Sequence, residues 1–214
     1  MTVSLCGYAL MRTPDSSLRR YEASSFARDN AAELERLRTA LPSVDPTQYR
    51  GISRDPLELL PHCSPNEPDD RALTLMRDLV PVDSVSLDPL VHLLPDRASA
   101  LKVHQLLDQP SHYEIIFVSR DPAASVDDSF GFDVGYWGGD HFSLICDVAV
   151  APRWHPPDPR DYAELAEQLR VLNAHALFRT RPDARAFTDY YRSKSWAESE
   201  FEPGEFAIIE VGAG

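Results

Sequence analysis

The chain has 214 residues, 43% of them hydrophobic, and a formal net charge of −13 at pH 7. A chain of this length can bury a substantial core. The acidic balance argues against nucleic acid and anionic membranes as partners, because both repel a negative surface. Three widely spaced cysteines form no disulfide framework, and no secretory leader or long apolar stretch stands out, so we expect a soluble cytoplasmic protein.

The N-terminal half alternates apolar segments with proline-rich ones. Residues 3–11 are apolar and predict a buried strand, which a Thr-Pro-Asp turn ends. Residues 24–41 repeat apolar side chains at helical spacing. Prolines are concentrated in residues 42–70 and punctuate residues 81–95, so we expect extended loops in both ranges.

Two shorter helices and a strand are expected next. Asp69 and Asp70 are suited to cap a helix that runs through Leu79, and residues 97–107 show a second helical pattern. Residues 113–119 form a near-continuous run of β-branched and aromatic residues. Such a run is typical of a strand that is covered on both faces.

Residues 130–150 are predicted to form the central hairpin of the sheet. Two apolar segments flank Gly138-Gly139, and glycines readily adopt the positive φ that a tight hairpin turn requires. A two-residue loop pairs Gly135 with Phe142. Because side chains alternate along a strand, a shift of one residue in this pairing would move every side chain to the other face.

This pairing divides the polar residues of the hairpin between two faces. Asp133 and Trp137 lie on one face, whereas His141, Ser143 and Asp147 lie on the other. The second set does not form a hydrolase triad. Ser143 and Asp147 are about 13 Å apart along an extended strand, and no nucleophile elbow is present.

The remaining residues predict two helices and a closing strand. Asp158 and Pro159 are typical of a helix start, and Thr180 is suited to cap a second helix. Residues 205–211 are apolar and predict the last strand.

The order of elements indicates an α+β fold with a mainly antiparallel sheet and helices packed on it. Its strands are clustered rather than alternating regularly with helices. The first and last strands are both apolar and are expected in the same sheet, which favours a single domain over residues 1–214. A break near Pro110 leaves open a helical N-terminal lobe, residues 12–110, beside a sheet-rich part, residues 111–214.

Asp140 and His141 at the turn are the most reactive-looking pair. A carboxylate can orient an imidazole for general-base catalysis, and Asp133 is an alternative acidic partner. Neighbouring residues on a strand point to opposite faces, so Asp140 reaches His141 only if the turn is distorted. The simpler interpretation is an ordinary turn, in which aspartate is common.

The sequence predicts neither a metal site nor a cofactor. His62 and Cys63 could join His141 and His155 around a metal ion, but no CxxC or HxxxH spacing supports such a site. No phosphate-binding loop or dinucleotide fingerprint is present. His175 is expected near a helix C-terminus, which favours its protonated form.

Aromatic and charged residues near the turn and in the following proline-rich segment are the candidate binding residues. Exposed tryptophans with a polar rim are typical anchors of protein interfaces. The predicted set comprises Tyr136, Trp137, Asp140, His141, Arg153, Trp154 and His155.

These features favour an acidic binding protein whose partner is another, basic protein. A cytoplasmic protein that neutralises a basic toxin or nuclease, as bacterial immunity proteins do, would fit the charge and the size, although no motif supports the comparison. The alternative is a small hydrolase-type enzyme that uses His141 as base with Asp133, Asp140 or Asp147. A structural, self-associating subunit is the third alternative. We favour binding because no catalytic set is complete.

Overall fold

The structure, a computed structural model, describes most of the predicted sheet and the helices beside it. The described residues are 6–15, 31, 32, 35, 39, 48–51, 67–79, 93–120, 127–137, 143–145, 159–194 and 205–214. Residues 31, 32, 35 and 39 are helical, in agreement with the helix predicted over 24–41, whose other residues lie outside the described set. Most of the predicted loops 42–70 and 81–95 lie outside it as well.

Helices and strands alternate in groups along the described chain. The helices are α4 (Glu67–Leu79), α5 (Arg97–His104), α6 (Pro159–Leu169) and α7 (Arg181–Arg192), and a short 3-10 helix, η3, spans Pro110–His112. The strands are β1 (Cys6–Arg12), β2 (Tyr113–Arg120), β3 (Ser129–Trp137) and β4 (Glu205–Ala213).

Three helix ends differ from the prediction, and one of them is the end of α6, which lies at Leu169 although its apolar stripe was expected to run on to Leu177. α4 begins at Glu67, inside the range predicted as a loop, because Pro68 is tolerated in a first helical turn, where its missing N–H costs no hydrogen bond. α5 ends at His104 rather than Leu107. The chain beyond it continues with tighter bonds between residues three apart, from Leu106 N to Val103 O and from Leu107 N to His104 O.

The strands form one antiparallel sheet in the order β1-β2-β4-β3. This arrangement confirms the predicted α+β fold with a mainly antiparallel sheet. The first and last strands share the sheet, as predicted, and β2 lies between them. β3 pairs only with β4 among the named strands, so it lies at the edge of the sheet and not at its centre.

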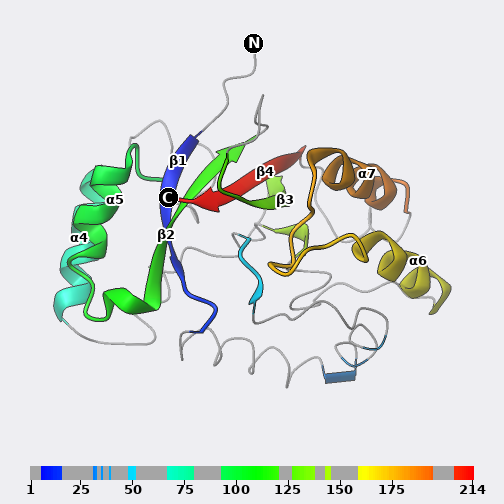
Figure 1. Cartoon of the computed structure of the whole chain (residues 1–214), viewed down its shortest axis with the longest axis horizontal. Coiled ribbons are helices and arrows are strands. Elements are labelled where there is room, and N and C mark those ends of the chain that lie inside the picture. Colours follow the sequence, from blue (N-terminus) through cyan, green and yellow to red (C-terminus); the bar gives the residue numbers. More distant parts are fainter. Residues whose placement is uncertain are drawn as a thin grey trace, which may run out of the picture.

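Two hydrophobic cores cover opposite faces of the sheet, because alternate residues of β1 belong to different cores, Ala9 and Met11 to one and Leu10 to the other. Figure 1 shows α4 and α5 beside β1 and β2, and α6 and α7 beyond β3 and β4. The first core includes Leu10, Leu73, Met76, Leu94, Val103 and Tyr113. The second includes Val134, Leu165, Leu169, Phe178, Phe187, Tyr191 and Ile208.

The hairpin predicted over 130–150 is present only in part in the described residues. Gly135 forms an isolated antiparallel bridge with Ser143, so the predicted pairing is wrong by one residue. Leu144 and Ile145 are helical and buried, so the second arm does not continue as a strand there. A short apolar run suits a buried helical turn as well as a strand, and its periodicity does not separate the two.

Candidate functional site

Two of the seven predicted binding residues lie in a described element. Tyr136 and Trp137 end β3, where they pair with Phe206 and Glu205 of β4. The others, Asp140, His141, Arg153, Trp154 and His155, lie outside the described residues. Of the residues proposed for catalysis, the structure places Asp133.

Asp133 is the centre of a buried polar cluster, although it lies on an edge strand. The residue is 1% exposed. Tyr49 Oη donates a hydrogen bond to its Oδ2 at 2.6 Å, and Ser143 Oγ donates to its Oδ1 at 2.8 Å. The backbone N–H of Val134 donates to the same Oδ1 at 2.7 Å. We call Tyr49, Asp133, Ser143 and the Val134 N–H the Asp133 cluster.

The position of Ser143 corrects the predicted faces of the hairpin. The predicted pairing assigned Asp133 and Ser143 to opposite faces, and this is wrong because the two side chains are hydrogen-bonded to each other. The bridge between Gly135 and Ser143 explains the error. A register that differs by one residue turns Ser143 to the face of Asp133.

The Asp133 cluster also covers the outer edge of β3. Alternate residues of this strand direct their N–H groups away from β4, and the N–H of Phe132 accordingly bonds to Phe178 O at 2.8 Å. The next outward N–H belongs to Val134, and the Asp133 carboxylate accepts it. On either side of Val134, Phe132 forms an antiparallel bridge with Phe178, and Gly135 forms one with Ser143. An edge whose polar groups are occupied is protected from pairing with another chain.

This geometry favours a positioning role for Asp133 over an acid–base role. A general base must reach a proton of the substrate, whereas this carboxylate is enclosed and accepts three hydrogen bonds. A buried carboxylate is tolerated when its oxygens are bonded in this way. Asp133 ties β3 to Ser143, and the predicted binding turn lies between these two in the sequence.

A turn over residues 172–178 supports β3 from its outer side. Asn173 Oδ1 accepts hydrogen bonds from the N–H groups of His175 and Leu177, and Asn173 Nδ2 donates to Phe130 O at 2.7 Å. Ala176 adopts a positive φ of 53° in this turn. The amide of Asn173 therefore both shapes the turn and attaches it to the strand.

Arg50 and His175 both contact the ring of Phe130 near the start of β3. The Arg50 guanidinium lies 4.3 Å from the centroid of the Phe130 ring, and the centroids of Phe130 and His175 are 5.2 Å apart. Burial, and then the positive charge of Arg50, hold the pKa of His175 below its ordinary value. The expected preference for protonated His175 is therefore wrong, because α6 ends at Leu169 and His175 lies beyond the reach of the helix terminus.

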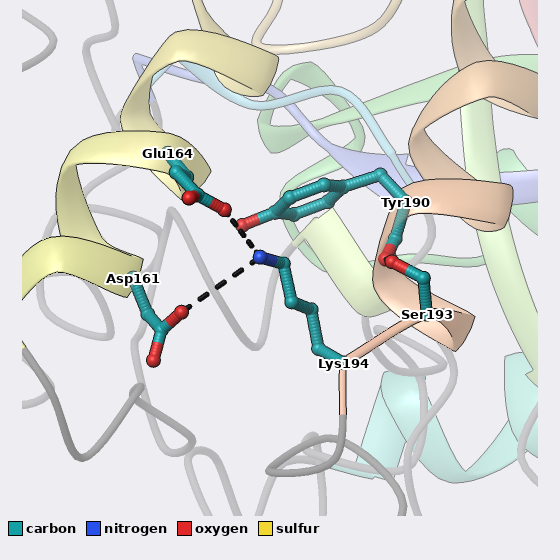
Figure 2. Close-up of polar contacts among 5 residues, drawn as sticks. All are labelled: Asp161, Glu164, Tyr190, Ser193 and Lys194. Carbon is teal, nitrogen blue, oxygen red and sulfur yellow. Dashed lines mark hydrogen bonds and ion pairs between the residues drawn. The ribbon is translucent and has the colours of Figure 1, made fainter.

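A second polar cluster joins α6 to the residues that follow α7 (Figure 2). Lys194 Nζ bonds to Glu164 and lies 3.7 Å from Asp161 Oδ1, and both carboxylates belong to α6. The ammonium group also lies 5.0 Å from the centroid of the Tyr190 ring. Because the cation is already paired with two carboxylates, we interpret the cluster as a clamp between the two helices.

Tyr190 is expected to ionise at a pH well above that at which an ordinary tyrosine ionises. Burial, followed by the negative charges of Glu164 and Asp161, raises the pKa of Tyr190 to about 12. In the unfolded chain the same phenol ionises near 10. The folded state therefore loses stability as the pH rises from about 10 toward 12. Phenolate absorbance, measured as the difference between wild type and Tyr190→Phe, should show a midpoint near 12.

Two variants of α6 test the cause of this shift. Glu164→Gln removes a charge that raises the Tyr190 pKa, so the midpoint should fall. Glu167→Gln makes the same chemical change at an exposed position whose carboxylate pairs with Arg170, and it should leave the midpoint unchanged. A wild-type midpoint near 10, or an equal response to both variants, would contradict the arrangement in Figure 2.

The fold and the clusters describe an α+β protein with a buried carboxylate at the edge of an antiparallel sheet. Among the described residues, no group of three or more His, Cys, Asp or Glu side chains is placed to hold a metal ion. No helix within the described ranges combines the length and apolar character needed to span a membrane. Comparisons with protein-family models, curated proteins and solved structures find no significant match.

Proposed function

We propose that this protein is an acidic binding protein that neutralises a basic protein partner, in the manner of a bacterial immunity or inhibitor protein. One observation carries the proposal: β3 ends in Tyr136-Trp137, and the buried Asp133 ties this strand to Ser143. The net charge of −13 supplies the attraction to a basic partner. We place the protein in the cytoplasm, where its three cysteines would stay reduced.

A firmly held strand beneath the binding residues lowers the cost of association. Each side chain that must be immobilised at an interface costs about 0.5–1.5 kcal/mol, and flexible backbone adds to this cost. The Asp133 cluster orders β3 and Ser143 before any partner arrives. Tyrosine and tryptophan are effective anchors on such a base, since they bury a large area with few rotatable bonds.

The experiment is an affinity capture from a lysate of the native host at low and at high salt. The tagged proteins are the wild type, the double variant Trp137→Ala/Asp140→Ala, and a control variant, Asp70→Ala/Asp78→Ala. The control removes two exposed carboxylates from α4, the helix beside β1 and β2 (Figure 1). It therefore changes the net charge by more than the double variant does and spares the predicted site.

We expect the wild type and the control to retain a basic protein at low salt and to lose it at high salt. The purified partner should bind the double variant at least tenfold more weakly in titration calorimetry, because loss of a central tryptophan anchor costs more than about 1.4 kcal/mol. Equal affinity for the double variant would place the site elsewhere. Binding that is insensitive to salt would refute the charge argument.

A further inference from the structure

Residues 48–51 (cyan in Figure 1), which we call the strap, contact β2 and β3 near the start of each strand. Arg50 attaches the strap at three points. Its backbone N–H donates to His175 O at 3.1 Å, and its Nη1 lies 3.3 Å from Glu114 Oε2 on β2. Its guanidinium also stacks on Phe130 of β3. The strap thereby connects β2 to the turn over residues 172–178.

The strap also reaches the Asp133 cluster. Tyr49 is 2% exposed and supplies the hydrogen bond to Asp133 Oδ2. Gly51 lies so close to Tyr49 and Asp133 that a Cβ atom at this position would overlap both side chains. Release of the strap would therefore remove one donor from the buried carboxylate.

His175 is the group in contact with the strap that changes charge near neutral pH. An ordinary imidazole titrates between about pH 5 and pH 8, where carboxylates stay ionised and guanidinium groups stay protonated. Among the described residues around it, Arg50 of the strap is the cation, whereas Phe130 of β3 and Asn173 of its own turn are uncharged. Glu114 of β2 is paired with Arg50.

We propose that the strap is an acid-sensitive latch: protonation of His175 places a second cation beside Arg50 and releases the strap from the turn over residues 172–178.

The pKa of His175 gives the sign of the effect. Burial and Arg50 hold this pKa below 6.5 while the strap is attached, and release lets it return toward that value. Attachment is therefore strongest above pH 6.5, and it weakens as the pH falls toward the lowered pKa. Below the lowered pKa, the contribution of neutral His175 to the attachment of the strap is lost in full, and a further fall in pH weakens it no more.

Hydrogen exchange of the full-length chain, followed by mass spectrometry, tests the latch. Exchange is measured at several pH values between about 7.5 and about 5, and the rates are corrected for intrinsic exchange. In the wild type, the peptide that contains residues 48–51 should exchange faster at the acid end, by up to about tenfold for each unit by which attachment lowers the pKa of His175. Peptides from β2 and β4 should not change.

Two histidine variants decide whether His175 is responsible. His175→Gln cannot be protonated, so its strap should show no acid-induced increase. His112→Gln alters a partly buried histidine of η3 and should behave like the wild type. An unchanged wild-type strap, the same increase in His175→Gln, or a simultaneous increase in β2 and β4 would each overturn the proposal.

A second measurement covers the case in which His175→Gln does not fold. The ring protons of His175 are titrated by NMR in the wild type and in Arg50→Gln. We expect a higher midpoint in Arg50→Gln, since the substitution removes the cation beside His175. An equal or lower midpoint would show that Arg50 and His175 are not coupled, and the latch would be refuted.

Discussion

Replacing Asp133 by alanine is expected to lower the free energy of unfolding by about 3–5 kcal/mol. The substitution removes the carboxylate that accepts hydrogen bonds from Tyr49 Oη, Ser143 Oγ and the Val134 N–H, at a position that is 1% exposed. Each buried donor that loses its partner costs about 1–3 kcal/mol. Local relaxation and entering water recover part of that sum. Urea denaturation of the two proteins measures the difference.

Smaller substitutions separate the hydrogen bonds of the Asp133 cluster from its packing. Tyr49→Phe and Ser143→Ala each remove one donor and leave the carboxylate its other partners, so each should cost about 1–2 kcal/mol. Asp127→Ala makes the same change as Asp133→Ala at an exposed position just before β3, and should cost no more than about 0.5 kcal/mol. If Asp133→Ala cost as little as this control, Asp133 would not hold the edge of the sheet.

The strands and the start of α7 could be predicted because local chemistry determines them. β2 is a run of β-branched and aromatic residues, which favour strands, although the half-buried Ile115 and Phe117 show that its two faces are not fully covered as predicted. α7 follows Thr180, whose Oγ1 accepts the N–H of Asp183 at 3.3 Å as an N-cap. The helical period then places Phe187 and Tyr191 in the core, where both are 1% exposed.

The Asp133 cluster could not be predicted because its contacts join distant segments. Tyr49 and Asp133 are 84 residues apart, and Tyr49 lies in a proline-rich range whose local pattern predicts only an extended loop. Ser143 depends on the register of the reversal that precedes it. The local sequence favours a two-residue Gly-Gly loop, because glycine adopts the required positive φ. The bridge from Ser143 to Gly135 and its hydrogen bond to Asp133 instead select a register that differs by one residue.

The place of β3 in the strand order and the lowered pKa of His175 could not be predicted for the same reason, because both depend on contacts between distant segments. Chain order suggests that β3 pairs with its sequence neighbours, but β4 from the C-terminus lies between β2 and β3. Local sequence likewise places His175 near the end of a helix, and it gives no indication that Arg50, 125 residues earlier, will contact the same Phe130 ring as His175. The local sequence pattern therefore predicts the helices and strands well, whereas the Asp133 cluster depends on which of them pack together in the tertiary structure.

Gly131→Ala should be nearly as destabilising as Asp133→Ala, because backbone conformation and packing both oppose a side chain there. Gly131 has a φ of 141°, next to the irregularity in the pairing of β3 with β4. For a residue with a Cβ, such a backbone costs about 1–3 kcal/mol. A Cβ would also lie 2.7 Å from Phe178 O and 2.9 Å from Asn173 Nδ2. Neither atom can move freely, since each forms a hydrogen bond to β3.

We therefore expect Gly131→Ala to lower the free energy of unfolding by at least about 3 kcal/mol, measured by urea denaturation. Ser129→Ala, at the start of the same strand, has no such strain and should cost less than about 1 kcal/mol. Combining Gly131→Ala with Asn173→Ala should cost less than the sum of the two, because the second change removes an atom that the new Cβ would overlap. Strict additivity would mean that Gly131 is required for its backbone conformation alone. A loss below about 1 kcal/mol would mean that the turn over residues 172–178 is not held against the strand.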